Sequence, residues 1–231
     1  MMKTYKYLYK KAKKVLFPGV YMDTYEQFNN DDIFKILDSI NPMWEYYVAC
    51  HGKYHAMFVA NTVEYILKSL SYDKKTIDLG KTAGLLHDIG CIVGRWNHAA
   101  MSAAIVSVWL ESTPLSPEEK NMITQAIENH SRGKTYSSAV DAALYIADKI
   151  DASKKRNLTP KPNHVRYKEL STIDNVKIYV KDKTITVDYI TSDILHIDKN
   201  KSPYNSIAEA AKYLGCACRF IINGKEYSEL N

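Results

Sequence analysis

Histidine and aspartate side chains recur where helical segments of this sequence begin or end. The clearest case is AGLLHDIGC, residues 83–91, in which His87 and Asp88 stand side by side directly after an apolar run. Imidazole and carboxylate groups are ligands for divalent transition metals, but polar residues at a helix end also serve as simple caps. A metal site requires further ligands elsewhere in the chain, which a cap does not.

Further candidate ligands interrupt other helical segments. His55 and His98 each open an apolar segment, His130 ends another, and Asp148 lies inside the otherwise apolar run LYIADKID. A helical bundle can bring such positions into one core, where an aspartate without a partner would cost several kcal/mol. Asp148 therefore needs a cation if it faces inward, and the donor set suits Fe, Mn, Zn, Co or Ni better than Mg alone.

Two adjacent residues on a regular helix point about 100° apart. His87 and Asp88 can still serve one centre if the helix loosens there, which Gly90 permits. The alternative is that Asp88 bridges two ions.

The other histidines are weaker candidates. We interpret His164 and His196 as structural or solvated, whereas His51 lies one helical turn before His55 and could share its face. Asp151 shares a face with Asp148 in the same way, but the lysines that follow it favour a surface role.

The elements that must position these groups are mainly helices. Apolar residues at helical spacing predict helices over residues 31–40, 54–70, 73–86, 99–110, 116–130 and 138–150. Ser116 and Glu119 have the spacing of a capping box, and Asn41-Pro42 marks a stop. Residues 99–110 are apolar nearly all round, which predicts deep burial.

The pattern changes after residue 156. NLTPKPNH reads as a linker, and two β-branched runs around Lys181-Asp182-Lys183 predict a hairpin. Residues 194–197 are a candidate further strand, residues 206–214 are predicted to form a helix, and CRFIINGKEY is either a strand or more of that helix. We therefore expect a mainly α protein, with a helical domain at residues 1–156 and a small α+β appendage at residues 157–231.

Composition bounds the remaining possibilities. The 231 residues are 46% apolar and 25% charged, which is globular usage and excludes a disordered chain. The net charge of +5 favours anionic partners but is too small to indicate nucleic acid. No apolar run approaches the roughly 18 residues that span a bilayer. The oligomeric state stays open.

The first fourteen residues, MMKTYKYLYKKAKK, concentrate lysine without the continuous apolar core of a signal peptide. They predict a basic amphipathic helix docked on the core, with contact to a membrane surface or RNA as the alternative. The cysteines form no CxxC pair, which indicates reduced thiols and a cytoplasmic location. These cysteines are Cys50, Cys91, Cys216 and Cys218, of which the last two are at best a weak metal pair.

Taken in order, the histidine and aspartate motifs resemble the HD superfamily of metal-dependent phosphohydrolases over roughly residues 50–156. The motifs are HAMFVA at 55–60, GLLHDIG at 84–90, NHAAMSA at 97–103, IENHSRG at 127–133 and YIADKID at 145–151. The resemblance implies an HD-type helical bundle that holds one or two divalent ions, drawn from Fe, Mn, Co, Ni or Zn and possibly with Mg.

The resemblance also implies a role for each ligand. His55, His87, Asp88 and Asp148 would bind one metal, as the corresponding residues do in that family. His98 and His130 would complete a second site, with Asp88 as the bridging carboxylate.

Within the superfamily, the sequence looks most like the bacterial proteins that hydrolyse diadenosine tetraphosphate, because of HSRG and YIADKIDASKKR. The gap between Asp88 and His98 is shorter than in those proteins. Cyclic-dinucleotide phosphodiesterases of the superfamily commonly carry lysine after HDIG, where this sequence has Cys91, which argues against that subgroup.

The expected chemistry is hydrolysis of a phosphoester or phosphoanhydride, in a nucleotide or another phosphorylated metabolite, by a metal-bound hydroxide. Asp88 would act at the metals, while nearby cationic side chains bind the substrate. These candidates are Arg95, Arg132, Lys134 and Lys149, of which Arg132 and Lys149 are also candidate catalytic residues. The alternatives are a di-iron oxygenase of the same superfamily and a non-catalytic nucleotide sensor.

Overall fold

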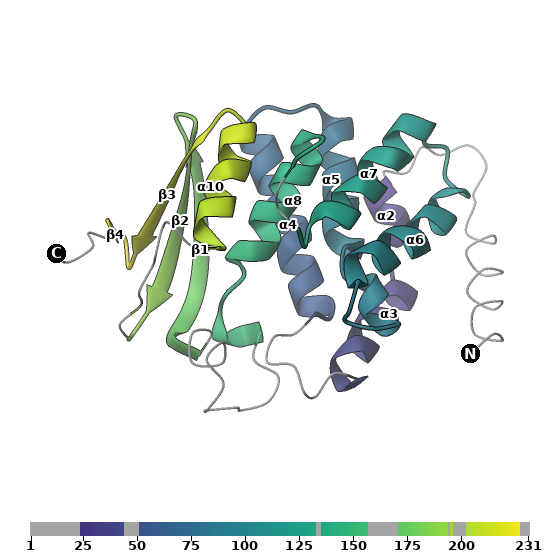
Figure 1. Ribbon diagram of the computed structural model, residues 1–231, viewed down its shortest axis with the longest axis horizontal. Coiled ribbons are helices and arrows are strands. Elements are labelled where there is room, and N and C mark those ends of the chain that lie inside the picture. The colour runs from purple at the N-terminus through teal and green to yellow at the C-terminus, as the bar shows by residue number, and fades with distance from the viewer. Residues whose placement is uncertain are drawn as a thin grey trace.

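Helices form the first two thirds of the described chain, and a small sheet closes it (Figure 1). The computed structural model describes residues 24–43, 51–132, 135–156, 171–193, 195 and 202–226. The helices of the bundle are α2 (Thr24–Phe28), α3 (Asp31–Met43), α4 (Lys53–Ser69), α5 (Lys74–Leu86), α6 (His98–Leu110), α7 (Pro117–Asn129) and α8 (Ala139–Ile150). The predicted mainly α architecture with a C-terminal α+β appendage is confirmed.

Local capping signals set several helix starts. Ser116 and Glu119 form the predicted capping box at α7, and Asp73 accepts a hydrogen bond of 2.9 Å from the backbone N–H of Thr76 at the start of α5. The predicted stop at Asn41-Pro42 is wrong, because α3 continues to Met43. A proline in the last turn removes only one backbone donor, so the turn can form around it.

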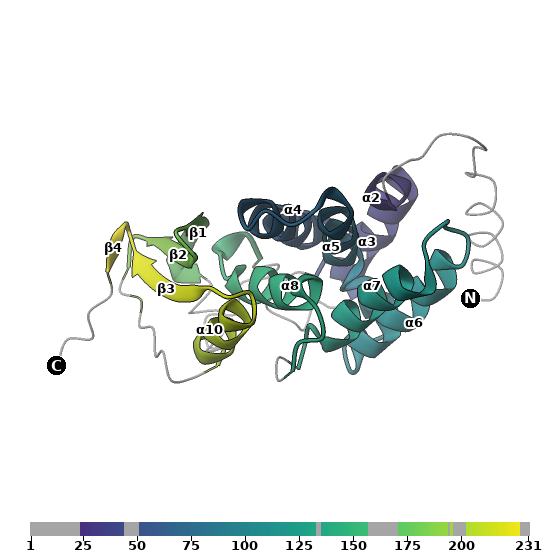
Figure 2. The same cartoon turned by 90° about the horizontal axis from the view of Figure 1, so that it is seen from above.

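Helix α8 lies at the centre of the fold. It contacts α4, α5, α7 and α10 (Tyr204–Tyr213), and Figure 2 shows it between these helices. All of its residues are buried except Ala139 and Lys149. Five of the buried positions are alanine or aspartate, whose small side chains allow neighbouring helices to approach closely.

Helix α6 is less buried than its sequence predicts. Val108 is 55% exposed, and Ala104 and Ser107 are also exposed. Within the described residues α6 packs on α7 and on the 3-10 helix Ile89–Ile92, at the edge of the bundle. The prediction of deep burial is therefore wrong, because the number of neighbours, and not the apolar content of a helix, decides how many of its faces are covered.

The appendage is a four-stranded sheet with one covering helix. Strands β1 (Ile173–Lys181) and β2 (Thr184–Thr191) form the predicted antiparallel hairpin, and both turn residues, Asp182 and Lys183, have positive φ. This is the backbone that a tight two-residue hairpin turn requires. Helix α10 then crosses to β3 (Ala217–Ile222), which runs parallel to β2, and β4 (Lys225–Glu226) pairs with β3. The described part of CRFIINGKEY, residues 218–226, is therefore strand, turn and strand, and not a longer helix.

The sheet and the bundle share one continuous cluster of buried apolar side chains. Helix α10 connects them, because it packs on both α8 and β3, and Tyr136 donates a hydrogen bond of 3.2 Å to the carbonyl of Ser206. The division into domains at residues 156 and 157 stays a prediction. Several predicted features lie outside the described residues: the basic helix at 1–14, Cys50, Lys134, the linker with His164, and most of the strand at 194–197 with His196.

Among the described helices, none combines the length and the hydropathy that a bilayer crossing requires.

Candidate metal centre

The chain loosens at the end of α5, where the His-Asp pair lies. His87 still has helical backbone angles, but Asp88 leaves the helix at φ −105° and ψ 5° and leads into the 3-10 helix. Gly90 in that turn lies against the first turns of α6, and a Cβ built on it would be 2.3 Å from the backbone nitrogen of Ser102. The glycine therefore permits a close backbone approach, which holds α6 and its His98 beside Asp88.

The first ligand cluster, which we call site A, contains two imidazoles and two carboxylates. The Nε2 atoms of His55 and His87 are 3.2 Å apart, and His55 Nε2 is 3.1 Å from Asp148 Oδ1. Asp88 Oδ2 lies 3.2 Å from His87 Nε2 and 3.6 Å from His55 Nε2. All four side chains are buried, although the sequence separates them by up to 93 positions.

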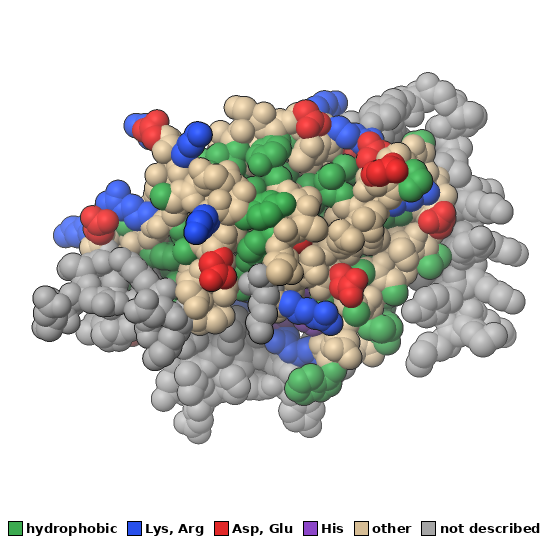
Figure 3. Space-filling view, turned by 45° about the horizontal axis from the view of Figure 1, so that its top comes forward, with side chains coloured by type: hydrophobic (Ala, Val, Ile, Leu, Met, Phe, Trp, Pro, Cys, Tyr) green, Lys and Arg blue, Asp and Glu red, His purple; other side chains and the backbone are tan. Residues whose placement is uncertain are grey.

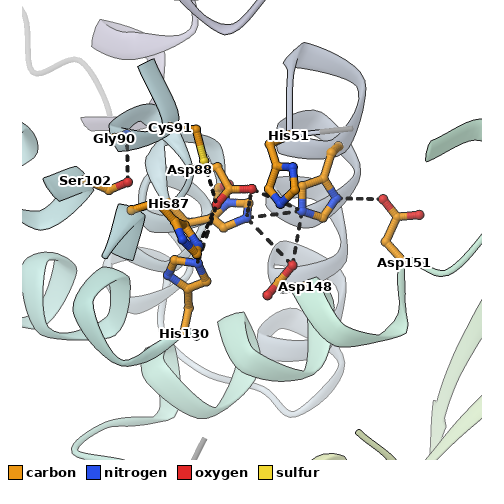
Figure 4. A network of polar contacts seen from close by, with 12 residues as sticks. His51, His87, Asp88, Gly90, Cys91, Ser102, His130, Asp148 and Asp151 are labelled. Carbon is orange, nitrogen blue, oxygen red and sulfur yellow. Dashed lines mark hydrogen bonds and ion pairs between the residues drawn. The ribbon is translucent and has the colours of Figure 1, made fainter. Parts of the chain in front are cut away.

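The second cluster, site B, lies on the other side of the same carboxylate. Asp88 Oδ1 is 3.4 Å from His98 Nε2 and 3.5 Å from His130 Nε2. The two Nε2 atoms are 3.1 Å apart. Figure 4 shows Asp88 among these side chains, with one oxygen directed to each cluster, which is the orientation of a bridging ligand.

The rear nitrogen of each imidazole contacts a hydrogen-bond acceptor. His87, His98 and His130 direct Nδ1 at the backbone carbonyls of Gly84, Arg95 and Ile127, at 2.8, 2.9 and 2.5 Å respectively. His55 directs Nδ1 at Asp151 Oδ2, at 2.7 Å. A carbonyl can only accept, so Nδ1 of each neutral ring carries the hydrogen and the Nε2 lone pair points into the cluster.

This arrangement fits a cation. In site A, two imidazole lone pairs and two carboxylate oxygens face one another, and within the described residues no hydrogen-bond donor reaches Asp88 Oδ2. Ligand atoms held about 2.1 Å from one ion lie about 3.0 to 3.4 Å apart in octahedral or tetrahedral coordination, close to most of the distances observed. Buried acceptors this close repel one another unless positive charge lies between them.

The surroundings of Asp88 and Asp148 favour the ionised carboxylate, which is the form that binds a metal. Burial alone would raise the pKa of Asp88, but the imidazoles of His87 and His51 outweigh it and hold the pKa well below its ordinary value. Burial likewise opposes ionisation of Asp148, and the Lys149 ammonium, with His55, holds the pKa of this carboxyl well below its usual range. Both side chains are therefore carboxylates at neutral pH.

The histidines divide into two kinds. Burial lowers the pKa of His130, which keeps its imidazole neutral and able to bind metal. For His87 burial acts in the same direction, but the carboxylates of Asp88 and Asp148 outweigh it and raise the pKa. The same negative charge would attract a metal cation.

Two side chains at the centre were not among the predicted ligands. The prediction that Asp151 lies on the surface is wrong, because it is 1% exposed and bonds to His55. The chain turns directly after α8, which brings Asp151 back toward α4, and Arg156 donates a hydrogen bond of 2.9 Å to its carbonyl oxygen. The three-residue spacing from Asp148 indicated that Asp151 could face the same way. The prediction instead followed the neighbouring lysines, which favoured a surface position.

His51 lies between the two clusters and precedes α4. Its ring centroid is 6.2 Å from that of His55 and 6.1 Å from that of His98, and Arg95 Nη1 lies 2.7 Å from its Nε2. His51 therefore lies beside His55, as its spacing in the sequence suggested. Its ring nitrogens belong to neither ligand cluster.

The cationic side chains predicted to bind substrate face different partners. Lys149 Nζ lies 2.6 Å from Asp148 Oδ2, so its charge is directed at the carboxylate of a candidate ligand. Arg95 extends toward His51, and Arg132 is exposed on the turn that follows His130. Their roles toward a substrate stay predictions. Cys216 and Cys218 are free thiols that join no ligand group in the described part of the chain.

Comparison with known proteins agrees with this geometry. The family model described as HD domain matches residues 52–153. These residues form an HD domain, and the resemblance to the HD superfamily of metal-dependent phosphohydrolases is confirmed. A search of the curated proteins finds no match to the chain.

Proposed function

We propose that this protein is a phosphohydrolase that uses one or two divalent metal ions to cleave a phosphoester or phosphoanhydride bond in a nucleotide. One observation carries the proposal: Asp88 directs one oxygen at His55 and His87 and the other at His98 and His130. A site built only to stabilise the fold has no need of this many converging acceptors, since a hydrocarbon core of the same size would serve as well.

The residues that would hold the metals follow from the two clusters. Site A would use His55, His87, Asp88 and Asp148, and site B would use Asp88, His98 and His130. Bound divalent ions lower the pKa of a coordinated water toward 7 and neutralise charge on a phosphoryl group.

The surrounding side chains orient these ligands. The backbone carbonyls and Asp151 hold the imidazoles, and Lys149 binds Asp148 Oδ2, which leaves Oδ1 of that carboxylate facing His55. Orientation by a second layer of hydrogen bonds is how proteins tune metal ligands. Arg95 and Arg132, beside site B, supply guanidinium groups of the kind that bind phosphate oxygens in pairs.

A nucleotide is the substrate class we favour, and diadenosine tetraphosphate is the first compound to test because of the HSRG and YIADKIDASKKR motifs. The positive net charge of the chain suits an anionic substrate. A cytoplasmic location remains our expectation, in agreement with the free thiols.

The proposal is tested by elemental analysis of the protein purified without added metal, followed by a screen for phosphate release from nucleotides. We expect a bound transition metal, and turnover that Asp88→Ala abolishes in a folded protein. Oxygen consumption by an iron-loaded protein without phosphate release would instead support a di-iron oxygenase. Tight nucleotide binding without turnover, whichever metal is present, would support a sensor.

A further inference from the structure

A cavity of about 290 Å³ adjoins site B and shares His98 with it. Two stretches of the chain line it: the residues from Arg95 to Ala100, and Ser131 with Arg132. Figure 3 shows basic side chains beside a histidine at the surface, with hydrophobic side chains nearby. The volume is at the lower end of the range for small-molecule sites, which suits one ring system with its phosphate.

Trp96 is the unusual residue of this cavity. It lines the cavity wall, yet its side chain is 87% exposed. By contrast, Trp109 in α6 packs its ring on Phe28, with centroids 6.2 Å apart. An exposed indole beside a polar site offers a large flat apolar face on which an aromatic ring of a ligand can stack.

The backbone fixes Trp96 relative to site B. The carbonyl of Arg95 accepts hydrogen bonds from both the backbone N–H of His98, at 3.3 Å, and its Nδ1, at 2.9 Å. Trp96 therefore lies within a short loop that the imidazole of a proposed metal ligand closes. Its backbone is therefore held close to His98.

The charge of the cavity is positive. Arg95 and Arg132 contribute guanidinium groups, and no carboxylate is among the described residues that line it. Guanidinium groups bind phosphate, and an indole stacks on an aromatic base with little dependence on which base it is. Together these features specify an anionic ligand that carries an aromatic ring close to its phosphate.

We propose that Trp96 is a base-stacking residue, and that the cavity from Arg95 to Arg132 binds the nucleoside part of the substrate beside site B. The inference rests on the proposed phosphohydrolase function, because that function is what makes the bound nucleotide a substrate. It goes further in assigning a residue that selects nucleotides over phosphorylated compounds without an aromatic ring.

Two non-hydrolysable probes separate base binding from phosphate binding. The first is α,β-methylene-ADP, and the second is methylenediphosphonate, which carries the same phosphonate linkage without the nucleoside. Calorimetric titration of the metal-loaded full chain gives the dissociation constant of each. Because base–aromatic stacking contributes to binding, Trp96→Ala should raise the dissociation constant for α,β-methylene-ADP by at least about fivefold. Binding of methylenediphosphonate should stay within about twofold.

Trp96→Phe should restore most of the affinity for α,β-methylene-ADP, because phenylalanine retains an aromatic face. Val108→Ala is the matched control, since Val108 is an exposed apolar residue of α6 that does not line the cavity. Circular dichroism checks that each variant is folded.

The inference is overturned if the wild type does not bind α,β-methylene-ADP, if Trp96→Ala leaves its affinity unchanged, or if both probes weaken equally. These results are independent of turnover. Nucleotide hydrolysis with no selective effect of Trp96→Ala rejects the base-stacking role and leaves the proposed function standing. Selective loss of base binding in a protein that hydrolyses nothing supports the role of Trp96 and rejects the proposed function.

Discussion

The imidazole of His55 is held from behind by the carboxylate of Asp151, with Nδ1 and Oδ2 2.7 Å apart. The other three imidazoles of sites A and B, those of His87, His98 and His130, direct Nδ1 at neutral backbone carbonyls. His55 thus differs from them in having a charged partner, which fixes its ring and makes Nε2 a stronger electron donor. Asp151 is in turn held by Arg156, whose Nε lies 3.8 Å from Oδ2.

Replacement of Asp151 should weaken metal binding at site A. We expect Asp151→Ala to lower the affinity of the metal-free protein for Mn²⁺ or Zn²⁺ by about 10- to 100-fold, because the ring of His55 loses both its orientation and its charged partner. Asp151→Asn should have a smaller effect, since an amide oxygen can still accept from Nδ1. Calorimetric metal titration measures both. Wild-type affinity in folded Asp151→Ala would show that the carboxylate does not act through His55.

The two ligand aspartates should differ in how many ions their loss removes. Asp88 has an oxygen in each cluster, so Asp88→Ala should empty both sites and abolish hydrolysis. Asp148 Oδ1 lies 3.1 Å from His55 Nε2 and 3.9 Å from His87 Nε2, both of site A, so Asp148→Ala should abolish hydrolysis but retain the three proposed ligands of site B. The metal content per chain, measured by elemental mass spectrometry, distinguishes the two variants.

Circular dichroism must accompany that measurement, because each substitution changes the charge of a buried site. Full metal content and full activity in both folded variants would reject the assignment of ligands.

Gly90→Ala should displace the start of α6. The added Cβ would lie 2.3 Å from the backbone nitrogen of Ser102 and 2.5 Å from the carbonyl oxygen of His98, and backbone atoms cannot rotate away. We expect a loss of about 1–3 kcal/mol in unfolding free energy and weaker metal binding at site B. Urea denaturation and metal titration measure these.

Gly94→Ala is the control for that substitution. A Cβ at Gly94 meets nothing within 4 Å, although the residue lies in the same connection between α5 and α6. Stability and metal binding should stay near wild type. Equal effects of the two substitutions would mean that the close approach at Gly90 is not what positions His98.

Asp141 should make the protein less stable as the pH rises. Burial raises the pKa of this carboxyl, in spite of its hydrogen bonds from Ser137 and Asn129. The folded state therefore binds a proton more readily than the unfolded state, whose carboxyl has a pKa of about 3.9. The contribution of Asp141 to stability is present below that value and is lost as the pH rises through the folded-state pKa.

Asp141→Asn keeps an oxygen to accept those hydrogen bonds and cannot ionise, so the fall in stability with rising pH should become shallower. Urea denaturation midpoints at about pH 4 and pH 7 measure it. Asp73→Asn should change the pH dependence of stability in the opposite direction. Hydrogen bonds from Thr76 lower the pKa of the exposed Asp73, so the contribution of Asp73 to stability is lost as the pH falls. An unchanged pH profile in Asp141→Asn would contradict the prediction.

Much of the architecture was predictable because its signals are local. The capping box at Ser116, the cap at Asp73 and the hairpin at Asp182-Lys183 each depend on residues within a few positions of one another. The exposure of α6 was not predictable in this way. Burial depends on which elements pack against a helix, and its own sequence does not contain that information.

The sequence by itself determined which side chains can bind a metal, because imidazole and carboxylate chemistry belongs to the residue type. The order of the motifs also indicated the HD domain that matches residues 52–153. Only the tertiary structure decided that the two oxygens of Asp88 face different clusters, that Asp151 supports His55, and that Arg132 lines the same cavity as Trp96. These relationships join residues that are far apart in the sequence. They follow from how the helices pack and how the chain turns between them, which no short stretch of sequence specifies.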